Sequence, residues 1–326
     1  MAARPFPDRA NLTICFAHVA YRLGDRLAAR NTGLRAIEVR SLDDLSARIP
    51  EADVLVVSGL WRNGLIERAA KLRFIQSIGA GTDQFPRDEL RARGVRLASA
   101  QGVNERAVAE HAMALILAMV RRIPEGRDNQ RRRHWRNMIS DPGKREDELG
   151  GKTLLIVGLG GIGSRLATLA RAFGLRVIAT KRDPSTRAAA ADVVVSDARL
   201  GEVLPQADIV ALTCPLTPQT EKLIGEAALA AMKPSAYLVN VARGRVVDEP
   251  ALIAALNAGR IAGAALDVTV EEPLPESSPL WGFDNVLITP HVAGETQRYE
   301  DNVLDVLLEN LDRLWRGETA LKNQIV

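Results

Sequence analysis

The sequence predicts an α/β protein of two domains, each built on a doubly wound parallel sheet. The chain has 326 residues, which is more than one hydrophobic core usually serves. Short apolar runs alternate with helix-length segments along nearly all of it, and this alternation is typical of parallel sheets covered by helices. A glycine-rich turn at residues 158–163 joins one such run to a helical segment, as in many doubly wound sheets.

The first hundred residues contain four candidate strands with helical patterns between them. The strands are short apolar runs at residues 13–19, 53–58, 73–78 and 95–99, and the helical patterns are at 25–31 and 64–70. Such an order predicts a parallel sheet with helices on both faces.

A long helix is expected over residues 105–121, and a polar stretch follows it up to Gly150. Residues 121–136 hold seven arginines. No nucleic-acid reading motif and no interleaved aromatic residues accompany them. This run is therefore interpreted as the solvated face of a surface helix or as an interface.

A second and more regular series begins at Lys152. Its apolar runs are at residues 153–157, 176–180, 192–195, 209–214, 236–240, 262–267 and 286–289. Seven runs, most of them separated by helix-length segments, meet the requirement of a doubly wound sheet. The segment 295–316 predicts a final amphipathic helix, because its apolar residues recur at helical spacing.

Composition and charge exclude several classes of function. The net charge is only +3. The two cysteines, Cys15 and Cys214, lie in apolar runs and are expected to be buried thiols. Residues 1–9 lack the apolar core of a signal peptide, and the longest apolar segment, 107–120, is too short to cross a bilayer. We expect a cytoplasmic protein with no membrane partner, no nucleic-acid partner and no metal site.

The glycine-rich turn predicts a dinucleotide site, because a strand enters it and a helical segment at 164–173 follows at once. Gly158 permits the tight turn, Gly160 lets the backbone approach a pyrophosphate, and Gly163 lets helix and strand pack closely. The N-terminus of the helix attracts the phosphates. Further residues expected to line this site are Gly161, Ile162, Cys214, Pro215, Val241 and Gly294.

The end of the next strand predicts which dinucleotide is used. An acidic residue there would hydrogen-bond the adenosine ribose and repel a 2′-phosphate. Lys181 stands at that position, Thr180 precedes it and Arg182 follows it. Two cations and a hydroxyl suit a 2′-phosphate, so NADP(H) is the expected cofactor and NAD(H) a weaker one. The alternative is a basic surface loop in which Asp183 replaces the missing acid.

Three motifs in the last third of the chain predict the chemistry, and each follows a candidate strand. They are Asn240-Val241-Ala242-Arg243-Gly244, residues 267–273 and Thr289-Pro290-His291. The guanidinium of Arg243 can hold a carboxylate at two points and reach a ketone oxygen. His291 is suited to proton donation near neutral pH, and Glu272 would orient it and favour its charged form. Arg243 and His291 are assigned to both the cofactor and the substrate site.

The other three histidines have simpler interpretations. His18 lies in a strand-like run and is expected to be structural. His111 follows Glu110 in a helix and is expected to pack at an interface. His134 lies in the arginine-rich stretch and is expected to be exposed.

The segment from Gly150 to Gly294 resembles the D-isomer-specific 2-hydroxyacid dehydrogenases, and among them the glyoxylate/hydroxypyruvate reductases. The matching stretches are residues 157–163, 240–244, 272–275 and 289–291, and upstream 77–83 and 107–111. The resemblance implies a catalytic triad of Arg243, Glu272 and His291. It also implies hydride transfer between a nicotinamide and a small 2-keto or 2-hydroxy acid of D configuration.

The resemblance implies further assignments. Backbone amides near Ile78, Gly79 and Ala80 would help to bind the substrate carboxylate, and Asp267 would lie near the nicotinamide carboxamide. A flavodoxin-like substrate domain, residues 1–104 and 295–326, would contain an inserted Rossmann cofactor domain, residues 105–294. The protein would be a homodimer joined through its cofactor domains. Trp135 would either anchor that interface or enter the partner's active site.

Two departures from the family pattern stand out, and two other functions compete. Thr269 replaces a common aromatic residue after Asp267-Val268, and Lys181-Arg182 replaces the acid of NAD-using members. Phosphite dehydrogenases share the fold and would keep all three catalytic groups, whereas formate dehydrogenases carry Gln at the position of Glu272 and fit poorly. A nucleotide-sensing corepressor would carry long tails or docking motifs, and neither is seen in the sequence.

Overall fold

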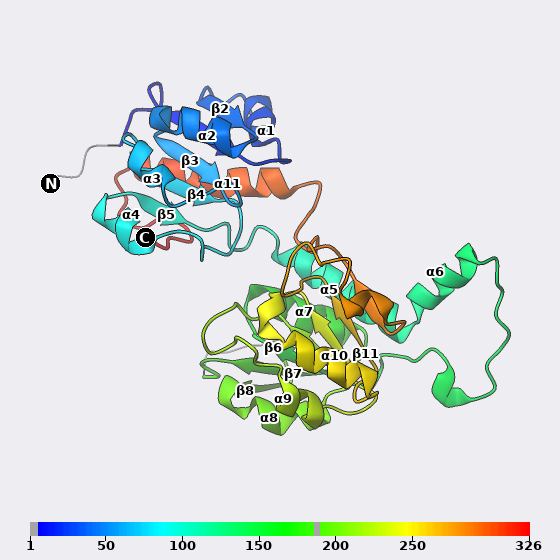
Figure 1. The fold of residues 1–326 in the computed structure, drawn as a ribbon. Coiled ribbons are helices and arrows are strands. Elements are labelled where there is room, and N and C mark those ends of the chain that lie inside the picture. Colours follow the sequence, from blue (N-terminus) through cyan, green and yellow to red (C-terminus); the bar gives the residue numbers. More distant parts are fainter. Residues whose placement is uncertain (1–5, 186–189) are drawn as a thin grey trace. The chain divides into compact units, whose positions relative to one another are not determined.

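The computed structural model describes residues 6–185 and 190–326, and the chain divides into two compact units (Figure 1). Unit 1 combines the chain up to Asn104 with Thr296–Val326, and unit 2 is Glu105–Glu295. Part of the N-terminal segment in which no signal peptide is predicted, residues 1–5, lies outside the described residues. Within the described ranges no helix has the length and apolar character needed to span a membrane.

Unit 1 contains a five-stranded parallel sheet in the order β2-β1-β3-β4-β5, the flavodoxin order. Side chains of β1 and β3 alternate between two apolar layers, so both faces of the sheet are buried. Helices α2, α3 and α4 cover one face, and α1 and α11 cover the other. The strands are β1 (Thr13–Ala17), β2 (Arg35–Val39), β3 (Val54–Val57), β4 (Phe74–Ser77) and β5 (Arg96–Ala98); the helices are α1 (Leu23–Ala29), α2 (Leu42–Arg48), α3 (Leu65–Arg68), α4 (Arg87–Ala92) and α11 (Tyr299–Trp315).

Unit 2 contains a seven-stranded parallel sheet in the order β12-β11-β10-β9-β6-β7-β8. Helices α5 and α7 cover one face, and α8, α9 and α10 cover the other. The strands are β6 (Thr153–Val157), β7 (Arg176–Lys181), β8 (Val193–Ser196), β9 (Ile209–Leu212), β10 (Tyr237–Asn240), β11 (Gly263–Leu266) and β12 (Val286–Ile288); the helices are α5 (Glu105–Val120), α6 (Ile123–Arg131), α7 (Gly161–Ala172), α8 (Leu200–Val203), α9 (Glu226–Ala231) and α10 (Glu249–Asn257).

The predicted fold class, two doubly wound parallel sheets, is confirmed. Several predicted bounds were wrong. Strand β2 was not predicted at all, because it is an edge strand whose side chains are mostly exposed or half-buried. Helix α7 begins at Gly161 and not at residue 164, and α11 begins at Tyr299 and not at residue 295. The predicted run 209–214 leaves the sheet after Leu212.

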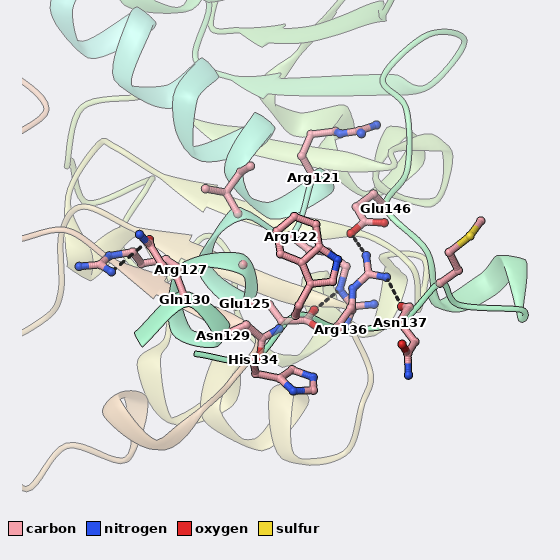
Figure 2. A pocket seen from close by; sticks show the side chains of 14 residues that line it. Arg121, Arg122, Glu125, Arg127, Asn129, Gln130, His134, Arg136, Asn137 and Glu146 are labelled. Carbon is pink, nitrogen blue, oxygen red and sulfur yellow. Dashed lines mark hydrogen bonds and ion pairs between the residues drawn. The ribbon is translucent and has the colours of Figure 1, made fainter. Parts of the chain in front are cut away.

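An arm, residues 121–148, extends from unit 2 and contains α6 (Figure 1). Helix α6 buries none of its residues, and after Ile123 and Pro124 its sequence is polar apart from one glycine. A hollow of about 640 Å³ lies between α6 and the stretch that follows it, and its lining includes the pair Arg136–Glu146 (Figure 2). Beside these charges three large apolar side chains are solvent-exposed: Ile123 (59%), Trp135 (94%) and Met138 (98%). His134 is exposed as predicted.

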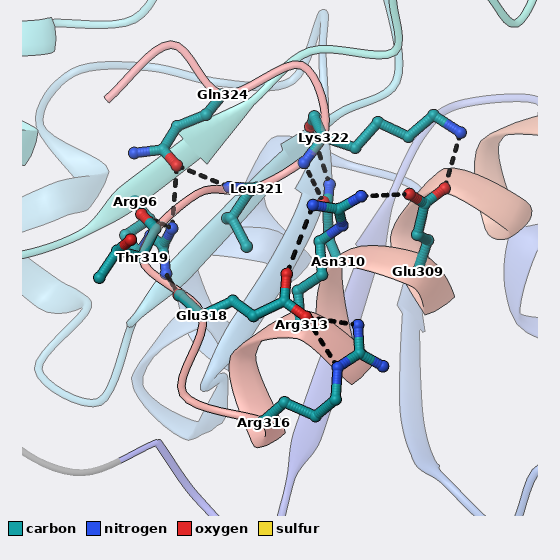
Figure 3. A network of polar contacts seen from close by, with 10 residues as sticks. All are labelled: Arg96, Glu309, Asn310, Arg313, Arg316, Glu318, Thr319, Leu321, Lys322 and Gln324. Atoms are coloured by element: carbon teal, nitrogen blue, oxygen red, sulfur yellow. Dashed lines mark hydrogen bonds and ion pairs between the residues drawn. The ribbon is translucent and has the colours of Figure 1, made fainter.

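The last residues of the chain are held to the rest of unit 1 by a polar network around Asn310 (Figure 3). The amide of this buried residue donates to Gln76 Oε1 (3.1 Å) and to the carbonyl of Lys322 (3.2 Å), and its oxygen accepts from the Lys322 N–H (2.7 Å). The segment beyond then pairs with β5 through an antiparallel bridge between Ala98 and Gln324. Helix α11 and this segment therefore form part of the fold of unit 1.

Candidate active site

The turn after β6 has the geometry of a dinucleotide cradle. Gly158 has φ +100°, and a Cβ there would lie 2.6 Å from the Cα of Cys214. A Cβ on Gly163 would lie 2.5 Å from the carbonyl oxygen of Gly158. Both positions therefore require glycine for packing. A Cβ on Gly160 would meet no atom within 4 Å, so the backbone at this residue, directly before α7, is open to a close-fitting ligand.

A cavity of about 510 Å³ lies beside this turn. The strand order reverses between β6 and β9, and ligands of open α/β sheets bind at such a switch point, beyond the carboxyl ends of the strands. The loops after β6, β7 and β9 all contribute to the cavity, and so bring together Gly158, Gly160, Lys181, Arg182, Cys214 and Pro215. The residues present therefore fit a dinucleotide.

The basic pair predicted to select the cofactor lines this cavity. Lys181 is half-buried at the end of β7 and Arg182 is exposed, and within the described part of the chain neither forms an ion pair. The carboxylate of Asp183 accepts from the Ser185 side chain (2.6 Å) and backbone N–H (3.0 Å), and these bonds lower the pKa of Asp183. Asp183 thus stabilises the following turn.

The three predicted catalytic residues follow three neighbouring strands of unit 2. Arg243 comes three residues after β10, Glu272 six after β11 and His291 three after β12. Adjacent parallel strands lie about 4.8 Å apart and end on the same side, so the three loops share one edge of the sheet. Glu272 Oε2 lies 2.7 Å from Nδ1 of His291, and both side chains remain part-exposed.

Glycine at position 244 allows the loop that carries Glu272 to approach the Arg243 loop. A Cβ on Gly244 would collide with the backbone carbonyl of Thr269. The Thr269 N–H donates to Glu272 Oε1 (3.2 Å), so the position of Thr269 also sets that of the carboxylate. Asn240, which is buried, fixes the Arg243 loop by accepting from the Ala242 N–H and donating to the Arg243 carbonyl, each at 3.0 Å.

Asp267 fixes the backbone around His291. The N–H of His291 donates to the Asp267 carbonyl (2.8 Å), and the N–H groups of Val292 and Ala293 donate to its carboxylate (3.0 Å each). The carboxylate also accepts from the hydroxyl of Thr289 (2.6 Å). Asp267 is 2% exposed and, like Val241 and Gly294, is not among the described residues that line the 510 Å³ cavity.

The predicted carboxylate-binding residues lie in unit 1, directly after β4. One of them cannot act as predicted, because the Ile78 N–H donates to the Val57 carbonyl (3.2 Å) as part of the sheet. The N–H groups of Gly79 and Ala80 have no acceptor among residues 6–185 and 190–326. The loop is held through its carbonyls: Tyr299 Oη donates to that of Ile78 (2.8 Å), and the Ala100 N–H to that of Gly79 (3.0 Å).

Two residues near the site had no predicted role there. His111, expected only to pack at an interface, has its Nε2 3.0 Å from the hydroxyl of Thr289 and 3.5 Å from Asp267 Oδ1. Thr289 was noted only as part of a motif. No local pattern could have revealed this contact, because 178 residues separate the partners. His18, by contrast, is structural as predicted: its Nδ1 accepts from two backbone N–H groups, and burial lowers its pKa.

The chain is similar to known dehydrogenases and reductases of 2-hydroxy and 2-keto acids. Residues 113–293 match the family described as D-isomer specific 2-hydroxyacid dehydrogenase, NAD binding domain. A glyoxylate reductase from Pyrococcus furiosus is 37% identical over 281 residues, which cover 85% of this chain and 83% of that protein. A D-3-phosphoglycerate dehydrogenase from Methanocaldococcus jannaschii is also 37% identical over 281 residues, 85% of this chain, but these span only 52% of that protein.

A solved structure extends the comparison. An NADPH-dependent glyoxylate/hydroxypyruvate reductase from Sinorhizobium meliloti superposes with a TM-score of 0.82 at 26% identity, covering 97% of this chain and 98% of that one.

Proposed function

Since the chain belongs to the D-isomer specific 2-hydroxyacid dehydrogenase family, we propose that it is an NADP(H)-preferring reductase of a small 2-keto acid. The substrate would be of the glyoxylate or hydroxypyruvate type and the product the D-2-hydroxy acid. Membership of the family makes the chain an NAD(P)-dependent dehydrogenase. The observation that carries the proposal further is the 2.7 Å contact between Glu272 and His291 at the sheet edge that Arg243 shares.

In the proposed mechanism, the bound nicotinamide supplies the hydride, and the chain's own residues bind and protonate the substrate. Arg243 holds the carboxylate and polarises the ketone, which a planar guanidinium does at two points. His291 gives a proton from Nε2 to the carbonyl oxygen. Glu272 accepts from Nδ1, which leaves Nε2 directed at the substrate and stabilises the charged imidazolium. The free N–H groups of Gly79 and Ala80 would add to the binding of the carboxylate.

The preference for NADP(H) is supported by the positions of Lys181 and Arg182. Both line the cavity beside the glycine turn, and the nearest acid along the chain, Asp183, accepts two hydrogen bonds from Ser185. The Sinorhizobium relative is NADPH-dependent. A 2′-phosphate at this end of the cavity would form charge-assisted hydrogen bonds with both cations.

The arm supports a homodimer. Trp135 and Met138 are almost fully exposed on it, and aromatic and Met side chains are enriched in protein interfaces. Light scattering is expected to give twice the chain mass of 35.4 kDa, and Trp135→Ala with Met138→Ser should shift the chain toward monomer. A wild-type monomer at micromolar concentration would contradict the homodimer. If Trp135 enters the partner's site, Trp135→Ala alone should raise the KM for the keto acid while the dimer persists.

A second candidate substrate is a phosphorylated 2-hydroxy acid. It is favoured by the 37% identity to a D-3-phosphoglycerate dehydrogenase, although this chain spans about half of that protein. A small 2-keto acid and its 3-phospho derivative, assayed in parallel, separate the two candidates by their kcat/KM. Phosphite, which would need the same three catalytic groups, is tested in the opposite direction, as formation of NADPH from NADP+, because its oxidation to phosphate reduces the dinucleotide.

The decisive experiment is NADPH consumption with a panel of 2-keto acids, measured on the wild type and three variants. His291→Ala should lose about 10²–10⁴-fold in kcat with little change in NADPH binding, because a general acid contributes that much and does not touch the phosphates. Arg243→Lys should lower kcat and raise the KM for the keto acid, because an ammonium cannot bind at two points. The control His134→Ala, on the exposed arm, should match the wild type.

Retention of more than about a tenth of kcat by His291→Ala would show that another group donates the proton. Wild-type constants in Arg243→Lys would show that another residue holds the substrate.

A further inference from the structure

The backbone at His291 adopts a conformation that needs support. Its φ is +54°, in the left-handed region that non-glycine residues seldom adopt. Such a residue keeps this conformation only where its surroundings impose it. Here the support comes from Asp267, whose carbonyl and carboxylate accept from three successive backbone N–H groups, at residues 291, 292 and 293. A displacement of Asp267 would therefore also displace the backbone of His291, the proposed proton donor.

The carboxylate of Asp267 is in turn held by Thr289. Thr289 Oγ1 lies 2.6 Å from Asp267 Oδ1 and 3.0 Å from Nε2 of His111. An ionised carboxylate only accepts, and a hydroxyl has one proton to give. Thr289 therefore donates to Asp267 and accepts from His111. The contacts thus form a directed chain from His111 Nε2–H to Thr289 to Asp267, and His111 must carry its proton on Nε2.

His111 also has an electrostatic relation to the buried acid. The side chain of Asp267 is 1% exposed, and a buried charge is costly without a partner. Among the described residues, His111 is the one basic side chain within 4 Å of it, with Nε2 3.5 Å from Oδ1. Helix α5, which carries His111, packs against β10 and β11 within unit 2, so His111 is supplied by a rigid element.

We propose that His111 is a positioning residue for the catalytic proton transfer. It acts through Thr289 and Asp267 to keep the left-handed turn at His291 in the position in which the imidazole ring contacts Glu272. This inference rests on the proposed function for the role of His291, but the hydrogen-bond chain itself can be tested without any substrate.

Steady-state kinetics on pairs of variants test the hydrogen-bond chain from His111 to Asp267. Thr289→Val keeps the shape and removes the hydroxyl, so kcat should fall about 10–100-fold, the range expected for a misplaced catalytic group. Thr289→Ser should stay near the wild type. His111→Leu should lower kcat, and His111→Gln, whose amide can still donate, should restore most of it. The KM for the keto acid should change little, because Arg243 is untouched.

A double variant separates positioning from general stability. If His111 acts through Thr289 and Asp267, the double variant His111→Leu with Thr289→Val should lose clearly less kcat than the product of the two single losses. Additive losses, or unchanged kcat in both single variants together with a lowered Tm, would show that His111 serves folding only and would overturn the proposal.

Nitrogen-15 NMR of the histidine rings gives an answer that does not depend on activity. His111 should show a proton on Nε2, protected from exchange, and lose that protection in Thr289→Val. A neutral ring protonated on Nδ1 alone would overturn the proposal whatever the kinetics. A wild-type chain that reduces no 2-keto acid, yet shows the Nε2 proton, would refute the proposed function and leave the hydrogen-bond chain standing.

Discussion

Exchanging the basic pair beside the cofactor cavity should reverse the choice of dinucleotide. The double variant Lys181→Asp with Arg182→Ala removes both cations and supplies a ribose acceptor at the end of β7. Lys181 is half-buried, so its bond to a 2′-phosphate is worth about 1.5–2 kcal/mol, the lower part of the range for charged hydrogen bonds. Arg182 is exposed, and an exposed pair adds about 0.5 kcal/mol. The sum, about 2–2.5 kcal/mol, corresponds to roughly 30–60-fold discrimination at about 1.4 kcal/mol per factor of ten.

The assay is kcat/KM for NADPH and for NADH at a saturating concentration of one 2-keto acid. The preference of the wild type should shrink between about 0.05 M and 0.5 M salt, because the screening length for exposed charges falls from roughly 14 Å to roughly 4 Å over that range. A matched control is Arg176→Ala, which removes an exposed cation at the opposite end of the same strand and should leave the ratio unchanged. Equal kcat/KM for both dinucleotides in the wild type would refute the role given to Lys181 and Arg182.

Three further perturbations follow from the packing. Gly244→Ala pushes a methyl group into the carbonyl of Thr269, so kcat should fall tenfold or more (about 10²-fold for a 1 Å displacement); a wild-type kcat would contradict this. Asn310→Leu leaves Gln76 Oε1 and the part-buried backbone N–H and carbonyl of Lys322 without their bonds to the Asn310 amide and should lower the free energy of unfolding in urea by about 2–4 kcal/mol; a loss below about 1 kcal/mol would show that water replaces the amide. Burial raises the pKa of the Cys214 thiol to about 11, so alkylation by iodoacetamide should be slow at neutral pH and accelerate only as pH approaches that value; fast labelling at neutral pH would refute it.

The sequence predicted most of unit 2, because its strands are buried on both faces and appear as continuous apolar runs. Strand β6 has the predicted bounds, 153–157. The start of α7 was placed too late, since glycines lower helix propensity although Gly161 and Gly163 both lie in its first turn. Strand β2 escaped prediction, because an edge strand with exposed charges has no distinctive pattern.

Within the site, the motifs predicted single residues and the pairing of Glu272 with His291, but not the contacts between residues far apart in the sequence. The glycine turn and the residues after β10, β11 and β12 could be identified because each chemistry-bearing residue directly follows an apolar run. The contact of His111 with Thr289 depends on how α5 packs on the sheet, which no local spacing specifies. The loss of Ile78 as an amide donor likewise depends on its pairing with Val57 in β3.

Unit 1 is built from two segments that lie far apart in the sequence, and this determines the order in which the two units can fold during synthesis. Its core joins Ile14 and Phe16 of β1 to Val303, Leu307 and Leu311 of α11. Residues 105–295 leave the ribosome between these two groups, and domains generally fold as units during translation. Unit 2 can therefore complete its core while β1 still lacks the helix that covers one of its faces. Until α11 emerges, only α1 covers that apolar face, and the part left exposed can bind chaperones, admit proteases or aggregate.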